Sequence, residues 1–268
     1  GVFDPCADDC GYDPQRMQEF VVEHDEDRAV NTVVWYNRGE RGAAALHSSG
    51  HVVMVRLGSD SHSFRLLNTN DLTWVDLATF GGHDISGVWR SDFSGERAVW
   101  DAWSAGGIMT AVASRPEETS LIGYNPTAEQ FVPTISGDLV CWIEKPLEGC
   151  VEEPCAYFVR CADLATEESF VASAALPAGE CVISTPVQHF PYVSGPWVAH
   201  SAYPCGDHDA RRLYRRIFHR GLDRSFVLAP FGAARVEVVE LVEDFVFLRV
   251  RPAGTDPVVP EGYYRCDL

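Results

Sequence analysis

The chain has 268 residues, 46% of them apolar, and a formal net charge of −18, so it can bury a full hydrophobic core. This charge disfavours nucleic acid as a partner, because phosphates would be repelled over most of the surface. No apolar run approaches the roughly 18 residues that a membrane-spanning helix needs. The first residue is glycine rather than methionine, which predicts processing or trimming at this end.

The first segment is acidic and contains two of the nine cysteines. Its aspartates do not have the spacing of an EF-hand calcium loop, so a solvated leader is favoured over a calcium site. We therefore expect an acidic leader over residues 1–16 and a single domain over residues 17–268. The four aspartates are Asp4, Asp8, Asp9 and Asp13.

One sequence pattern occurs twice, first from Pro133 to Trp142 and again 58 residues later from Pro191 to His200. Each copy predicts a short strand, a tight turn at Ser-Gly and a second strand. Weaker copies precede Trp35, Trp100 and Leu248. Self-similarity at a period of tens of residues in a β-rich chain predicts an array or a propeller.

Two further strands are predicted after each copy, as in Tyr157 to Leu164 followed by Ser169 to Val171. Four strands make one propeller blade. The last unit stops at its third strand, Tyr263 to Leu268, and Glu19 to Val22 can supply the fourth and leave no free sheet edge. The sequence thus predicts an all-β, five-bladed β-propeller with four antiparallel strands per blade, in which the N-terminal strand completes the last blade.

The repeat resembles that of the TolB-like propellers of the bacterial cell envelope. The matching residues are Ser136-Gly137-Asp138 and Ser194-Gly195-Pro196 at the turn, and Asp163-Leu164 and Asp267-Leu268 at a strand end. The resemblance implies the propeller fold and a tendency to bind partners at the envelope. It supplies no catalytic residues, and no Gly-x-Ser-x-Gly nucleophile motif is present.

The nine cysteines favour disulfides over metal ligands, because no Cys-x-x-Cys pair occurs. An oxidising compartment is therefore expected. Strand pairing predicts a Cys141–Cys161 bridge, a tight loop predicts Cys150–Cys155, and Cys181–Cys205 is plausible between units. Cys266 is expected to lie close to the N-terminal segment, which carries Cys6 and Cys10. Because nine is an odd number, at least one of these three cysteines is expected to form no disulfide within the chain.

If the Pro-x-(Ile/Val)-Ser segment is the innermost strand of each blade, alternate residues face the central channel. The apolar set of alternate residues should pack between blades and contains Phe93, Ile135, Val193 and Leu241. The set that faces the channel gives the candidate ligand-binding residues Asp27, Asp92, Thr134, Tyr192 and Glu240. This ring has three possible interpretations: a hydrated channel, a bound cation such as calcium, or sugar cleavage by Asp27, Asp92 and Glu240.

The stretch from Arg211 to Arg224 is the only basic one. Its arginines come largely as adjacent pairs, which fall on opposite faces of a strand. A solvated outer edge strand is the favoured interpretation, and a docking patch for an acidic partner is the alternative.

The function predicted from these features is that of a periplasmic, cell-surface or secreted propeller without enzymatic activity. It would bind a protein or a glycan through its loops and central funnel, with no cofactor unless a cation occupies the funnel. The alternatives are a glycoside-active five-bladed enzyme and a structural subunit of an extracellular assembly. Neither nucleic acid nor a membrane span is expected.

Overall fold

The computed structural model describes residues 20–25, 30–36, 44–49, 52–57, 63–68, 73–76, 91–102, 106–112, 114–147, 157–182, 191–205, 214–228, 235–251 and 262–268. These residues form antiparallel strands and two short 3-10 segments, η3 (Ala172–Ala175) and η5 (Arg220–Leu222). No helix in these ranges is long and apolar enough to cross a membrane. The expected leader over residues 1–16 lies outside them, as do Cys6, Cys10, Cys150 and Cys155.

The described strands form six sheets that follow one another along the chain. The first is a pair, β1 (Phe20–Asp25) and β2 (Val30–Tyr36). The second contains β3 (Ala44–Ser49), β4 (Val52–Leu57), β5 (Ser63–Asn68) and β6 (Trp74–Asp76). The third contains β7 (Ser91–Ser94), β8 (Arg97–Ala102), β9 (Gly107–Val112) and β10 (Arg115–Ile122).

The fourth sheet contains β11 (Ala128–Ser136), β12 (Leu139–Pro146), β13 (Phe158–Asp163) and β14 (Glu168–Val171). In the fifth, β15 (Glu180–Cys181) and β16 (Tyr192–Ser194) both pair with β17 (Trp197–Pro204), which is followed by β18 (Tyr214–His219) and β19 (Arg224–Val227). The sixth contains β20 (Arg235–Val242), β21 (Phe245–Arg251) and β22 (Gly262–Asp267).

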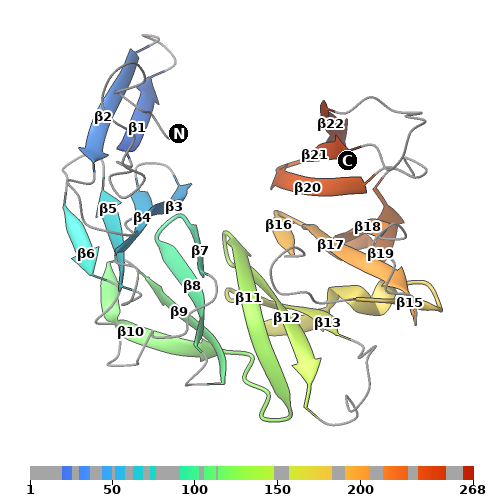
Figure 1. The fold of residues 1–268 in the computed structure, drawn as a ribbon. Helices are drawn as coiled ribbons and strands as arrows, with labels where there is room; N and C mark the ends of the chain where they lie inside the picture. Colours follow the sequence, from blue (N-terminus) through green and yellow to red (C-terminus); the bar gives the residue numbers. More distant parts are fainter. Residues whose placement is uncertain are drawn as a thin grey trace, which may run out of the picture.

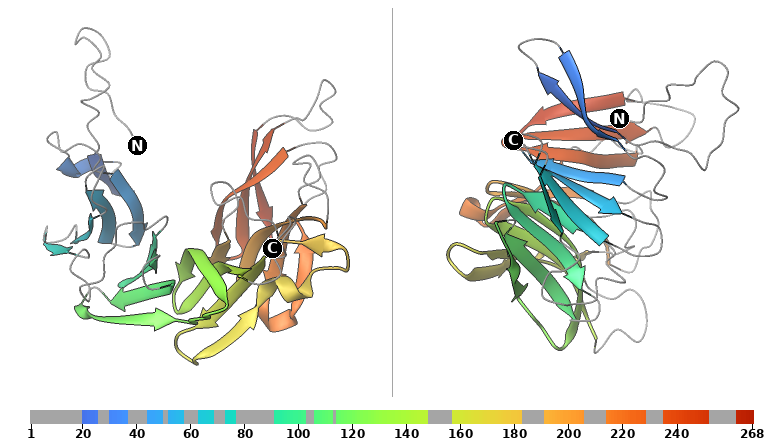
Figure 2. Two further views of the ribbon diagram at one scale, coloured as in Figure 1. Left: turned by 60° about the horizontal axis from the view of Figure 1, so that its bottom comes forward. Right: turned by 90° about the vertical axis from the view of Figure 1, so that its left-hand side faces the viewer.

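The sheets are arranged around an arc with their first strands on the inside (Figure 1). Strands β3, β7, β11, β16 and β20 contact one another in that order. Successive sheets are stacked and rotated relative to one another (Figure 2). In the second, third and fourth sheets four strands follow chain order and alternate in direction, which confirms the predicted all-β, antiparallel four-stranded unit.

The predicted division into five units is not confirmed, because its N-terminal part was placed wrongly. The sheet β3–β6 lies inside the stretch that was assigned to a single unit, between Trp35 and Trp100. The N-terminal strand also does not complete the last sheet. In the described structure β1 pairs with β2, with Phe20 opposite Tyr36, while β22 pairs with β21.

Apolar side chains fill the spaces between successive sheets. One cluster joins Val99 of β8 to Ile135 of β11, another joins Cys141 of β12 to Val193 of β16, and a third joins Ile217 of β18 to Leu241 of β20. The apolar residues that were predicted to pack between units are all buried: Phe93, Ile135, Val193 and Leu241.

The Ser-Gly turns link neighbouring sheets through a repeated hydrogen bond. The Ser94 hydroxyl accepts the Gly137 N–H at 2.9 Å, and the Ser136 hydroxyl accepts the Gly195 N–H at 3.4 Å. Ser194 accepts the N–H of Glu243 at 2.7 Å. Each donor is the first residue of the next sheet's turn and has positive φ, a conformation that favours glycine and that Glu243 adopts at φ 50°.

The ends of the third strands repeat a second contact on the same side of the sheets. Leu164, Arg220 and Leu268 each donate a backbone N–H to a carbonyl of the turn in their own sheet, at 2.8–2.9 Å. Asp163 caps the chain that follows β13, because its Oδ1 accepts the N–H groups of Ala165 and Thr166. The side-chain hydrogen bond from Arg220, supported by this capping, lowers the pKa of Asp163. The Asp-Leu pairs of the sequence thus mark a structural contact.

The structure contains disulfides between Cys141 and Cys161 and between Cys181 and Cys205, two of the pairs expected from the sequence. The first joins directly opposed residues of β12 and β13. The second ties the two-residue strand β15 to the end of β17. Cys266 of β22 is free and partly buried.

The basic stretch does not form a solvated outer strand, contrary to the favoured interpretation. Strand β18 lies between β17 and β19, and Arg215 and Arg216 are both buried. Arg215 bonds the Ser201 hydroxyl, and Arg216 forms a two-point ion pair with Glu180. Adjacent residues on opposite faces are both buried here because neighbouring sheets or loops cover both faces of the strand.

Removing one inter-sheet hydrogen bond should lower the stability measurably. Ser194→Ala is expected to reduce the free energy of unfolding by roughly 1 kcal/mol, the usual net contribution of such a bond. Ser169→Ala, at an exposed position of β14, is the matched control and should change it by less than about 0.5 kcal/mol. Urea unfolding measures both, and equal losses would refute a special role for the turn serine.

The two disulfides should differ in their resistance to reductant. Cys141 and Cys161 are both 0% exposed, whereas Cys205 is exposed. Because a reductant must reach a sulfur atom of the bridge, graded phosphine reductant followed by alkylation and peptide mass spectrometry should label Cys181 and Cys205 first. In denaturant the difference should disappear. Simultaneous labelling of all four cysteines in the folded protein would contradict this.

Candidate functional site

Four of the five predicted ring residues occupy equivalent positions on the innermost strands. Each lies opposite the residue seven positions later: Asp92 opposite Val99, Thr134 opposite Cys141, Tyr192 opposite Ala199, and Glu240 opposite Phe247. Strand β3 contributes a fifth such position, because His47 lies opposite Met54. Sequence reasoning missed His47. The fifth predicted residue, Asp27, lies outside the described residues, and so does the side chain of Glu240.

Asp92 links two innermost strands. Its Oδ2 accepts the Thr134 hydroxyl at 2.7 Å and the Ile135 N–H at 2.9 Å, and its Oδ1 accepts the N–H of Phe93 at 2.8 Å. Both carboxylate oxygens are therefore engaged with groups that hold β7 against β11. Thr134 is buried. This geometry gives the pair a structural role in joining two sheets.

Among the described residues, no three His, Cys, Asp or Glu side chains gather closely enough to hold a metal ion. The ring positions with described side chains contribute one carboxylate, that of Asp92. A funnel cation is therefore an expectation that involves Asp27 and Glu240, whose side chains are not described.

A cavity of about 230 Å³ lies at the opposite end of the strands from the Ser-Gly turns. It is formed where β10 connects to β11, and where β8 and β12 end. Its rim carries Tyr124 and Leu147, each 55% exposed. The other lining residues are Asp101, Gly106, Asn125, Pro126, Ala128, Glu129, Gln130 and Phe131.

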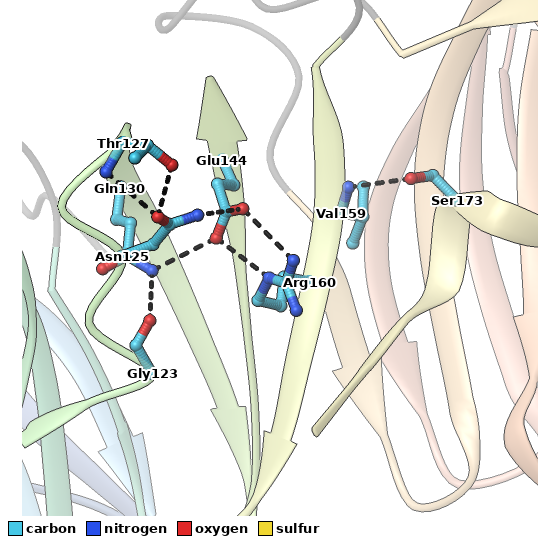
Figure 3. A network of polar contacts seen from close by, with 8 residues as sticks. All are labelled: Gly123, Asn125, Thr127, Gln130, Glu144, Val159, Arg160 and Ser173. Atoms are coloured by element: carbon cyan, nitrogen blue, oxygen red, sulfur yellow. Dashed lines mark hydrogen bonds and ion pairs between the residues drawn. The ribbon is translucent and has the colours of Figure 1, made fainter. Parts of the chain in front are cut away.

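A buried polar network forms the wall behind the cavity (Figure 3). At its centre is Glu144, which is 3% exposed and accepts Nε of Arg160 at 2.9 Å and Nδ2 of Asn125 at 3.0 Å. Gln130 Nε2 donates to the Gly123 carbonyl at 2.6 Å and to Glu144 Oε2 at 3.3 Å. Asn125 in turn accepts the N–H and hydroxyl of Thr127. The network fixes the connection that carries Tyr124.

Gly123 is required at the start of this connection. Its φ is +55°, and a Cβ placed there would lie 2.7 Å from the ring of Trp142. The backbone of the connection thus passes directly against this ring. No pattern in the sequence singled out this glycine, since it lies in a Gly-Tyr-Asn-Pro stretch that reads only as a turn.

Strand β11 carries a strained residue beside the cavity. Val132 has φ 49°, an unusual conformation for a β-branched residue, at the bulge between Phe131 and Thr134. The buried carboxylate of Asp101 accepts its N–H at 3.3 Å. Bulges precede the equivalent positions His47 and Glu240 in β3 and β20, so the bulge belongs to the repeat.

His200 is a buried titratable group in the position that Trp100 and Trp142 occupy in the two preceding sheets. It lies opposite Arg216 in the β17–β18 pairing. Burial lowers the pKa of His200 to about 4; the charge of Arg216 acts in the same direction, and the Ser201 backbone opposes it. The imidazole is therefore neutral at physiological pH.

No protein-family model matches the sequence, and no curated protein matches it either. Solved structures do resemble it. The tricorn protease is 12% identical, with a TM-score of 0.56 over 82% of this chain and 24% of that chain. The uncomplexed acylaminoacyl peptidase of Pyrococcus horikoshii is 10% identical, with a TM-score of 0.53 over 84% of this chain and 38% of that chain.

TolB from Acinetobacter baumannii is 11% identical, with a TM-score of 0.48 over 77% of this chain and 47% of that chain. The chain thus spans less than half the length of each of these proteins. Together with the stacked four-stranded antiparallel sheets, the two likenesses above a TM-score of 0.5 identify a β-propeller fold. At these identities the likeness concerns the fold alone, and no family follows from it.

Acid should destabilise the protein through His200. In the unfolded chain this histidine takes up a proton below about pH 6.5, whereas in the folded protein it stays neutral until about pH 4. Stability is therefore lost as the pH falls through this window, by roughly 3 kcal/mol in total. The variant His200→Leu carries the residue that occupies the equivalent position in the next sheet, Leu248. Its unfolding free energy should fall less over the same pH range, and the difference should equal this amount. Parallel pH profiles of the two proteins would contradict the assignment.

Proposed function

We propose that the chain is a non-enzymatic propeller that binds a partner protein through the face carrying the β10–β11 cavity. The observation that carries the proposal is the pair of exposed apolar side chains, Tyr124 and Leu147, on the rim of a hollow with a rigid polar wall. Large apolar side chains at the rim of a concave site are typical of interaction surfaces. A glycan stacking on Tyr124 is the competing occupant.

The contacts of Asp92 favour binding over sugar cleavage. A glycosidase needs one carboxylic acid poised to donate a proton and a second carboxylate able to act on the sugar. Both oxygens of Asp92 instead accept hydrogen bonds that join β7 to β11. A structural subunit of an extracellular assembly would use the same face and differs from a binder only in the permanence of its contact.

A secreted or envelope location is part of the proposal. Two disulfides, together with nine cysteines in the chain, fit an oxidising compartment. Calcium at the ring positions is kept as a subsidiary proposal. If it binds there, calcium should raise the melting temperature and a chelator should lower it, because a ligand of the folded state stabilises by mass action.

The site is tested by paired surface variants in an affinity capture from native extracts. Tyr124→Ala with Leu147→Ala should abolish recovery of a specific protein. Leu222→Ala with Phe226→Ala, which remove similarly exposed apolar groups near β19, should not. Unfolding midpoints of both variants establish that they are folded. Equal recovery by the two variants, or recovery only of glycan, would overturn the proposal.

A further inference from the structure

We propose that the outer edge of β22 is an interface at which two copies of this chain pair, with a disulfide between their Cys266 residues. The pairing continues the sixth sheet of one copy into the sixth sheet of the other around a twofold axis. It goes beyond the proposed binding face, because it uses another sheet and another partner. It rests on the open edge of β22, on the order of its charges and on its free cysteine.

Within the part of the chain that the structure describes, the outer edge of β22 has no neighbouring strand. Strand β22 is the outermost strand of the sixth sheet and pairs only with β21 (Figure 1). In the two preceding sheets the third strand also pairs with a fourth, β14 or β19. An edge of this kind is a template on which another strand can pair.

The alternation along β22 identifies the backbone groups that this edge presents. Leu268 donates its N–H to the carbonyl of the turn before β21 at 2.8 Å, so its backbone polar groups point toward β21. Successive residues of a strand direct these groups to opposite sides. Tyr263, Arg265 and Asp267 therefore direct their N–H and C=O groups away from β21. A strand added at this edge would bond to these three residues.

The charges of the edge favour one register of antiparallel self-pairing. Arg265 and Asp267 are both exposed and have opposite charges. A twofold axis at Arg265 would place the two arginines opposite each other, and an axis at Asp267 would oppose the two aspartates, both of which are unfavourable. An axis at Cys266 instead places each Arg265 opposite Asp267 of the other copy. Each such pair also exchanges two backbone hydrogen bonds.

An axis at Tyr264 gives the competing register. It would place Tyr263 of one copy opposite Arg265 of the other. Both side chains already have cation–π contacts within their own sheet, because Arg249 lies over the ring of Tyr263 and Arg265 lies over the ring of Phe245. This register therefore gains less from the pairing of an arginine with an aromatic ring.

The favoured axis also brings the two Cys266 thiols together. Cys266 is free and partly buried, and an odd number of cysteines cannot all pair within one chain. Its backbone groups point toward β21, so the two copies of Cys266 would form a non-hydrogen-bonded pair, with Cα atoms about 4.5 Å apart. Disulfides span this separation. Cys141 and Cys161, which lie opposite each other in β12 and β13, are bridged with their Cα atoms 4.0 Å apart.

The bridge needs an oxidant, and a small-molecule disulfide such as oxidised glutathione supplies it. One Cys266 thiolate attacks the small disulfide and releases one thiol, which leaves a mixed disulfide on the protein. The Cys266 thiolate of the second copy attacks the protein sulfur of that mixed disulfide and releases the second thiol. The two protein thiols lose two protons and two electrons, and the oxidant gains them.

The test mixes unlabelled and isotope-labelled protein in an oxidising glutathione buffer. Light scattering should detect a dimer that reductant returns to monomer. Digestion after Glu261 should release the peptide Gly262–Leu268 joined to its labelled counterpart. Cys266→Ser should form no dimer. Absence of the dimer from the unmodified protein, an equal amount of dimer from Cys266→Ser, or a bridge from Cys266 to Cys6 or Cys10 would overturn the proposal.

Charge variants test the register. Arg265→Asp should slow dimer formation by about fivefold or more, because like charges then face each other across the edge. Arg265→Asp with Asp267→Arg restores opposite charges and should recover the rate to within about twofold. Arg224→Asp, at an exposed position of β19, makes the same change in net charge and should leave the rate unchanged. Equal slowing by the two single variants, or no recovery in the double variant, would contradict the proposed pairing.

A moved cysteine tests the position of the axis. In Tyr264→Cys with Cys266→Ser, the thiols of two copies meet if the axis lies at Tyr264. In the proposed register Tyr264 lies opposite Leu268 of the second copy, so this variant should form no more dimer than Cys266→Ser alone. Unfolding midpoints establish that the variants are folded. Cross-linking as efficient as that of the unmodified protein would reject the axis at Cys266.

Discussion

The hydrogen bond between a turn amide and the serine of the preceding sheet is the contact on which the arrangement depends. Sheets that bury both faces must keep a fixed rotation relative to their neighbours. Apolar packing alone does not specify that rotation, because it is not directional. The bonds from Gly137, Gly195 and Glu243 to the preceding serines supply direction at three successive junctions. The bond from Thr134 to Asp92 adds to one of these junctions.

These contacts lie at one end of the strands, so the two ends of the sheets differ in what they present. The ends of the strands with the Ser-Gly turns are occupied by bonds between and within sheets. At the opposite ends, the chain between β10 and β11 is held by the network around Glu144 and presents exposed side chains to solvent. A rigid connection with exposed apolar groups loses little entropy when it binds, which is the physical basis for placing recognition there.

The repeat in the sequence was sufficient to predict antiparallel four-stranded units, the equivalent positions of Asp92, Thr134, Tyr192 and Glu240, and the burial of Phe93. It failed at the N-terminus, although Ser49-Gly50 followed by Val52 to Val55 carries the same signal and would have revealed β3 and β4. The burial of Arg215 and Arg216 was missed because charge alone suggested solvent. The cavity could not be predicted, since its lining comes from the end of β8, the connection between β10 and β11 and the end of β12, which only the fold brings together.

Hydrogen exchange at the turn amides tests the linking role of the serines most directly. Gly137, Gly195 and Glu243 lie in exposed turns, where an N–H without a partner exchanges rapidly with solvent. The account predicts slow exchange of these three amides in the intact protein, with Glu243 among the slowest because its bond is the shortest, at 2.7 Å. Exchange of all three at the rate of an unstructured peptide would contradict the claim that the serines hold the sheets together.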